Sequence, residues 1–146
     1  MRLTTNLSEQ CVEFNDTRRI AVFKDDKESR EFIVNNLRNK SLKKYRVDNC
    51  LISEGEKCDY LLVVEDEKLY FIELKGSDLI KAVSQINTSL DKLLSSFSHN
   101  AVNGIIVLSK VNTPDLRDTR LIKLSKRLKE LNGTLVYGSK KMEEQL

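Results

Sequence analysis

Residues 58–75 contain two apolar segments joined by a short acidic stretch, and this arrangement restricts the fold more than any other part of the chain. The first segment reads CDYLLVV, the second reads KLYFIELK, and the triplet EDE separates them. Apolar runs of this length around a charged turn are typical of a β-hairpin. Glu73 and Lys75 stand two positions apart in the second strand, so alternation projects both side chains from one face. That face is either solvated or chemically active.

The register of the hairpin decides whether Asp59, at the start of the first strand, joins this face. If Asp59 lies opposite Glu73, paired residue numbers sum to 132, and if it lies opposite Lys75 they sum to 134. Both sums are even, which requires an odd-length loop, such as three residues at 65–67. A tight two-residue turn gives an odd sum and puts Asp59 on the other face. The sequence contains no Asn-Gly or Asp-Gly pair here that would demand such a turn.

The remaining pattern predicts an α/β protein with a mixed sheet and helices on both faces. Residues before position 25 fit either a short hairpin, from CVEFND and RRIAVF, or an irregular lead-in. Ser77 is a plausible N-cap for the second helix, and Gly133 is the expected C-cap of the third. The expected elements, in chain order, are a helix over 25–40, a strand in 42–52, the hairpin, a helix over 78–97, a strand in 103–109, a helix over 116–133 and a strand in 134–138.

Composition limits the class of protein. A chain of 146 residues fits one domain with a real core, and no stretch approaches the roughly 18 apolar residues of a membrane span. The N-terminal segment lacks the apolar core of a signal peptide. Three cysteines without a CxxC spacing favour reduced thiols and a cytoplasmic location, with no disulfide framework and no zinc site. The single histidine, His99, excludes multi-histidine metal sites.

Asp59, Glu73 and Lys75 on one face would have a clear chemical use. Two carboxylates about 4 Å apart repel by roughly 4 kcal/mol at an effective dielectric constant near 20. A Mg²⁺ ion relieves that repulsion because it prefers oxygen ligands, and the backbone carbonyl of Leu74 could add another. The metal would lower the pKa of a bound water and stabilise charge on a phosphodiester. Lys75 could then orient or activate the attacking water.

These residues resemble the motif of the PD-(D/E)xK nuclease superfamily. The motif is an acid on one hairpin strand and an acid-x-lysine triplet on the next, here Asp59 and Glu73-Leu74-Lys75. Cys58 stands where the family often has a proline. The resemblance covers residues 25–109 and implies the restriction-endonuclease-like αβββαβ core. Residues 1–146 would then form a single nuclease-like domain, with 1–24 as an uncertain lead-in and 110–146 as a C-terminal helix and strand.

The resemblance also implies roles for residues outside the triplet. An acid on the first helix often reaches the metal, and helical angles favour Glu31 over Glu28. A polar residue on the helix after the motif often faces the cleft, which implies a catalytic role for Gln85. Lys81 lies one turn before Gln85, on the same helix face, and is a candidate for binding nucleic acid.

The function implied by the resemblance is Mg²⁺- or Mn²⁺-dependent hydrolysis of phosphodiesters, with DNA favoured over RNA. The small size favours structure-selective cleavage, as in resolvase-like members, and a homodimer would suit cleavage of both strands. Lys43, Lys44 and Arg46 form a basic cluster on the strand before Asp59 and could contact phosphates. Two alternatives remain open. One is a catalytically inactive module of the same fold that binds nucleic acid or protein. The other is a different α/β fold in which Glu73 and Lys75 only face water.

Overall fold

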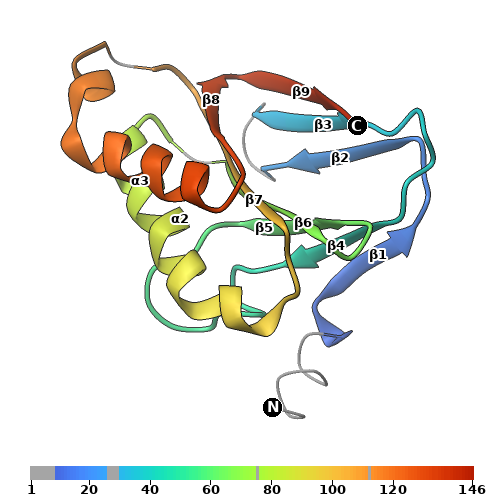
Figure 1. Ribbon diagram of the computed structural model, residues 1–146. Coiled ribbons are helices and arrows are strands. Elements are labelled where there is room, and N and C mark those ends of the chain that lie inside the picture. Colours follow the sequence, from blue (N-terminus) through green and yellow to red (C-terminus); the bar gives the residue numbers. More distant parts are fainter. Residues whose placement is uncertain (1–8, 26–29, 75, 112) are drawn as a thin grey trace.

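The computed structural model describes residues 9–25, 30–74, 76–111 and 113–146, which are arranged in three layers (Figure 1). A six-stranded mixed sheet forms the middle layer. Two α-helices cover one face of it, and a three-stranded sheet covers the other. The α/β class and the mixed sheet are therefore confirmed. The prediction of helices on both faces is wrong, because a second sheet takes the place of one helical layer.

The middle sheet has the strand order β1-β4-β5-β6-β7-β8. The pairs from β1 to β6 are antiparallel, whereas β6–β7 and β7–β8 are parallel. The parallel step from β6 to β7 requires a crossover connection, which a helix provides. The strands of this sheet are β1 (Val12–Asp16), β4 (Leu42–Arg46), β5 (Tyr60–Val64), β6 (Lys68–Leu74), β7 (Ala101–Leu108) and β8 (Leu135–Ser139).

The crossover helix is α2 (Leu79–Leu93), which continues into a 3-10 turn, η1 (Leu94–Ser96). The predicted helix over 78–97 is thus confirmed, although its N-cap is Asp78 and not Ser77, since the Asp78 carboxylate accepts from the Lys81 amide. A second 3-10 turn, η2 (Thr113–Arg117), leads into α3 (Thr119–Glu130). At the end of α3 the left-handed residue is Asn132, with φ 64°, and not the expected Gly133.

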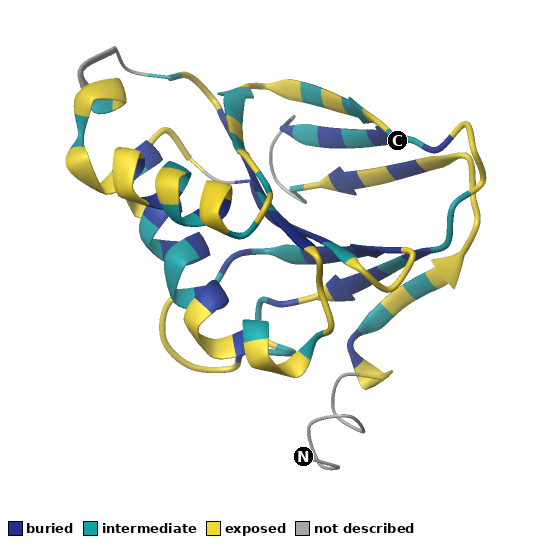
Figure 2. Cartoon of the chain, viewed as in Figure 1, coloured by how far each residue is buried: buried dark blue, intermediate teal, exposed yellow. Residues whose placement is uncertain are grey.

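The three-stranded sheet has the order β2-β3-β9, from β2 (Ile20–Lys24), β3 (Glu31–Asn35) and β9 (Lys141–Gln145). In β2 and β3 every second residue is buried, and the buried set includes Phe23, Phe32 and Val34. Two cores result. One lies between the middle sheet and the helices, and the other lies between the two sheets. Figure 2 shows the buried residues concentrated on the central strands between these layers.

The helix predicted over 25–40 is wrong. Residues 31–35 form β3, and a turn follows in which the buried Asn36 side chain donates to the carbonyls of Arg18 and Lys40 and accepts from the Lys40 amide. Leu37, which the helical reading placed on the buried stripe, is 55 % exposed. The period-two burial of Phe32 and Val34 explains the outcome, because it suits a β-strand packed on one side.

The N-terminal segment is ordered into strands, but they do not form a hairpin with each other. β1 pairs with β4 in the middle sheet, while β2 pairs with β3 in the small sheet. Cys11 and Cys50 form a disulfide with a Cα–Cα distance of 5.7 Å, so the prediction of three reduced cysteines is wrong. Cys58 keeps its thiol and is buried.

None of the helices in the described part of the chain is long and apolar enough to cross a membrane.

Candidate functional site

In the hairpin that carries the motif, the numbers of paired residues add up to an even sum. Val64 pairs with Lys68 across the three-residue loop 65–67, and Tyr60 pairs with Ile72, so paired numbers sum to 132. Glu65 and Asp66 both adopt positive φ, which lets a loop of this length reverse the chain. Of the alternatives that the sequence left open, the structure has the three-residue loop. This register brings Asp59 to the end of β6 that carries Glu73.

Asp59 occupies an irregular position at the end of the β5–β6 ladder. Its amide donates to the carbonyl of Ile72 (3.0 Å), the residue that already pairs with Tyr60. Two residues of one strand therefore oppose one residue of the other, as in a β-bulge. The Asp59 Oδ2 atom then accepts from the Leu74 amide at 2.8 Å. In a regular ladder this amide would meet the backbone of residue 58, so the carboxylate replaces a backbone acceptor.

Glu73 lies next to this contact but is directed into the helix-side core. It lies on the same face of β6 as Leu69 and Phe71, which pack in that core. Its exposed fraction is 0 %. Burial raises the pKa of the neighbouring Cys58 thiol, and the charges of Glu73 and Asp59 raise it further. The burial of Glu73 also means that access to its carboxylate requires some opening of the helix-side core.

A hydrogen-bond chain from α2 fixes the segment before Asp59. The buried Ser89 hydroxyl accepts from the Cys58 amide (2.8 Å) and donates to the Gln85 carbonyl (2.8 Å). The backbone at Asp59 is therefore anchored to the helix that crosses from β6 to β7. Gln85, the predicted catalytic residue on this helix, is 7 % exposed. It lines a pocket together with Lys81, which lies one turn earlier.

We expect Ser89→Ala to lower the free energy of unfolding by about 1–3 kcal/mol, because it leaves the buried Cys58 amide without its acceptor. Ser84→Ala on the same helix is the matched control, since the Ser84 hydroxyl donates to Glu56 in an exposed contact. Its effect should stay within about 0.5 kcal/mol. Urea unfolding monitored by circular dichroism measures both. Equal losses in the two variants would contradict the anchoring role of Ser89.

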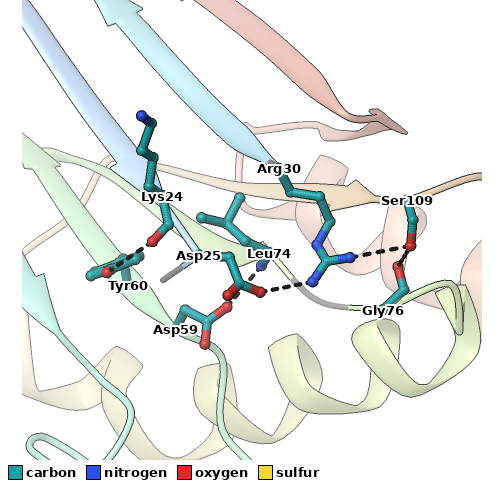
Figure 3. Close-up of polar contacts among 8 residues, drawn as sticks. All are labelled: Lys24, Asp25, Arg30, Asp59, Tyr60, Leu74, Gly76 and Ser109. Carbon is teal, nitrogen blue, oxygen red and sulfur yellow. Dashed lines mark hydrogen bonds and ion pairs between the residues drawn. The ribbon is translucent and has the colours of Figure 1, made fainter. Parts of the chain in front are cut away.

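A polar network from the small sheet borders the same end of the hairpin (Figure 3). The buried Arg30 guanidinium pairs with Asp25 (2.8 Å) and donates to the Ser109 hydroxyl (3.1 Å). The Ser109 hydroxyl in turn donates to the Gly76 carbonyl (2.9 Å). In Figure 3 the carboxyl groups of Asp25 and Asp59 point toward the same space. Sequence reasoning missed this network because it depends on strand pairing between distant segments.

Glu31, the predicted acid of the first helix, is placed differently. It is the first residue of β3 and stands on the outer face of the small sheet, opposite the buried Phe32. Its carboxylate oxygens lie 3.9 Å from Lys24 Nζ and 3.8 Å from Lys141 Nζ. Because the expected helix is a strand, the helical angle that favoured Glu31 does not apply. Asp25 is the acid that this segment brings to the hairpin end.

The basic cluster before Asp59 is largely engaged within the protein. The Lys44 ammonium is buried, 3.1 Å from Glu13 and 4.4 Å from the Tyr60 ring centroid. Lys43 pairs with Glu9 at 3.0 Å. Arg46 is exposed, and its Nε donates to the Asp48 carbonyl. We therefore assign Lys44 a structural role.

Oxygen donors suited to Mg²⁺ gather at the hairpin end. The N–H and C=O of a strand residue face the same neighbouring strand, so the Leu74 carbonyl lies on the side of β6 that holds the Asp59 carboxylate. Carboxylate and carbonyl oxygens are the ligands that Mg²⁺ prefers. Within the described ranges, no three His, Cys, Asp or Glu side chains are grouped so as to hold a metal ion. Lys75, the predicted catalytic lysine, lies outside the described residues.

Comparison with protein-family models, with curated proteins and with solved structures gave no significant match.

Proposed function

We propose that the protein is a metal-dependent nuclease of the PD-(D/E)xK type that hydrolyses phosphodiesters in nucleic acid. The observation that carries the proposal is the contact between Asp59 Oδ2 and the Leu74 amide (2.8 Å). It brings the acid of one hairpin strand next to the backbone of the acid-x-lysine triplet on the other, which supports the motif reading. The order of three antiparallel strands, a crossover helix and a parallel strand, from β4 to β7, also supports a restriction-endonuclease-like core.

In this proposal Asp59, Glu73 and the Leu74 carbonyl hold Mg²⁺ or Mn²⁺, and Lys75 orients the attacking water. The metal supplies charge stabilisation on the phosphodiester and a water of lowered pKa. Glu31 has no part in this site, and Asp25 lies beside Asp59 (Figure 3) without forming a three-carboxylate group with Asp59 and Glu73. Arg30 holds the Asp25 carboxylate and, through Ser109, the Gly76 carbonyl that directly follows Lys75.

The proposed substrate is DNA in preference to RNA, cleaved according to its shape more than its base sequence. The described chain forms one sheet with its two covering layers and offers no separate base-reading domain within those residues. A homodimer that cleaves both strands of a duplex belongs to the same proposal. The Cys11–Cys50 disulfide removes the argument from reduced cysteines for a cytoplasmic location.

A second candidate is a catalytically inactive module of the same fold that binds nucleic acid or protein. The burial of Glu73 favours it, because a hydrated metal ion has to reach the carboxylates. The two candidates differ in one measurable property, which is turnover in the presence of Mg²⁺.

The test is cleavage of labelled duplex, four-way-junction and single-stranded DNA, and of matching RNA, with Mg²⁺, Mn²⁺, Ca²⁺ or EDTA. We expect products with Mg²⁺ or Mn²⁺ and none with EDTA. Binding of any of these nucleic acids without products under every metal condition would overturn catalysis and support the inactive module. A protein that neither binds nor cleaves any of them contradicts the nucleic-acid assignment altogether.

A further inference from the structure

A polar pocket of about 400 Å³ lies between the loop that precedes Asp59 and the N-terminal half of α2. The loop contributes one wall and the first two turns of the helix contribute the other. The side chains that give the pocket its chemistry are Asp48, Asn49, Glu56, Lys57, Lys81 and Gln85.

The walls of this pocket are fastened to one another. Glu56 accepts from the Ser84 hydroxyl of α2 (2.6 Å), and Lys92 of α2 donates to the Glu54 carbonyl (3.0 Å). The Cys11–Cys50 disulfide holds the other end of the same loop to the start of β1. The pocket is therefore built by contacts at both ends of the loop and is not a gap beside a loose segment.

Gln85 is the residue that points to a ligand. It is 7 % exposed and lines the pocket, yet within the described residues no hydrogen bond reaches its side-chain amide. The amide oxygen and nitrogen are not among the enclosed, partnerless polar atoms of the described residues, so the amide is open to the pocket and available to a ligand there. A polar ligand in the pocket would supply both a donor and an acceptor to this group.

The other lining groups define the chemistry of that ligand. Lys57 and Lys81 are cations suited to a phosphate. Asn49, Asp48 and the Gln85 amide can hydrogen-bond the edge of a nucleobase, as amides and carboxylates do in nucleic-acid grooves. A mixture of cations, carboxylates and amides fits a ligand that carries both an anionic group and a base edge. The volume lies at the lower end of the range for small-molecule sites, which suits one nucleotide and not a base pair.

We propose that this pocket receives one unpaired nucleotide adjacent to the phosphodiester held at Asp59. The proposal rests on the proposed function, since it takes nucleic acid as the ligand. The pocket and the hairpin end are connected through the same backbone segment. Lys57, which lines the pocket, stands two residues before Asp59. The Ser89 hydroxyl links the intervening Cys58 amide to the Gln85 carbonyl. An enzyme with such a pocket requires a nucleotide that is unstacked, and unstacking costs least where the base is already unpaired. The substrates it selects are therefore single strands, flaps and junctions.

Equilibrium binding in EDTA tests the pocket without cleavage. The probes are a fluorescein-labelled single-stranded 12-mer and a blunt duplex of the same sequence, followed by fluorescence anisotropy. We expect the wild-type protein to bind the single strand at least about tenfold more tightly than the duplex. Gln85→Leu should weaken single-strand binding about tenfold, as expected for losing one base-edge contact, and leave duplex binding within twofold.

Lys81→Ala provides a second variant, because Lys81 is exposed and its loss does not disturb the core. It should also weaken the single strand more than the duplex. Lys123→Ala on the exposed face of α3 is the matched charge control and should affect both probes equally. The proposal is overturned if wild-type protein does not prefer the single strand, or if Gln85→Leu and Lys81→Ala weaken both probes to the same extent. If the protein cleaves DNA with Mg²⁺ but Gln85→Leu does not change binding, the nucleotide pocket is contradicted and the nuclease function stands. If Gln85→Leu weakens single-strand binding but no cleavage occurs, the pocket stands and the nuclease function is contradicted.

Discussion

Asp59→Asn is expected to reduce Mg²⁺-dependent cleavage at least a hundredfold, on the order of the several kcal/mol of charge stabilisation that a catalytic metal provides. The substitution removes one negative charge and keeps the shape of the side chain. The asparagine Oδ1 can still accept from the Leu74 amide, so the end of the β5–β6 ladder is retained. Initial cleavage rates over a Mg²⁺ titration measure the effect, and unfolding by urea verifies that stability changes little.

Asp66→Asn is the matched control for Asp59→Asn. The substitution makes the same change of charge at the exposed turn of the same hairpin. Asp66 has φ 57°, a conformation that asparagine tolerates well. Its cleavage rate should equal that of the wild-type protein. A nuclease activity that survives Asp59→Asn unchanged would show that the metal-binding carboxylates lie elsewhere.

Gly133→Ala is expected to lower the free energy of unfolding by about 3 kcal/mol or more, at the upper end of overpacking effects. A Cβ atom at Gly133 would stand 1.7 Å from the Val102 carbonyl oxygen and 2.5 Å from its carbon. Both atoms belong to the backbone of β7, where Val102 pairs with Leu69 of β6 and its amide donates to the Leu131 carbonyl, so they cannot move away alone. Thermal and urea unfolding would show the loss directly.

Gly138→Ala is the comparison for Gly133→Ala, because its added Cβ meets only the Met142 side chain, at 3.2 Å from the sulfur atom. Methionine is flexible and can yield at low cost. We expect a loss of less than about 1 kcal/mol. Similar losses for the two glycines would mean that close approach to β7 is not what requires glycine at position 133.

The hairpin and the crossover helix could be predicted because their signals are local. A charged triplet between two apolar runs predicts the hairpin and allows a three-residue loop, whereas the register itself is established by the strand pairing in the structure. The stripe on α2 steps at helical spacing, and Leu79, Val83, Ile86 and Leu90 are all buried. In both segments the pattern of a few neighbouring residues determines the outcome.

The segment from 25 to 40 was mispredicted because its apolar residues are few and adjacent. Ile33 and Val34 fit a helical stripe as well as a strand, and the acidic residues before them favoured a helix start. Tertiary contacts decide that this segment is a strand. Phe32 and Val34 pack against the face of β4 to β7 that the small sheet covers, and β9 pairs with β3 from the far end of the chain. The Cys11–Cys50 disulfide likewise depends on the pairing of β1 with β4, which no spacing of cysteines reveals.

The residues of the candidate site also divide into those that a local pattern predicts and those that depend on tertiary contacts. Asp59 and the residues that follow it in β6 could be found from the hairpin alone. Asp25 and Arg30 could not, because they reach the site, and the Ser109 hydroxyl after β7, only when the small sheet packs on the middle one. The β-bulge at Asp59 was also beyond the sequence, since it arises where the ladder ends and a side chain takes over from the backbone.

The disulfide between Cys11 and Cys50 closes a covalent ring across 39 positions, and that ring contains β1, β2, β3 and β4. On the loop-entropy account, it removes about 4 kcal/mol of chain entropy from the unfolded state. The hairpin of β2 and β3, which carries Asp25 and Arg30, is thereby tethered at both of its ends. If this hairpin lifts from the middle sheet in a local opening event, it cannot diffuse far, and its return is a short-range search. The covalent ring therefore keeps Asp25 and Arg30 at a high effective concentration near Asp59 even when the hairpin opens locally.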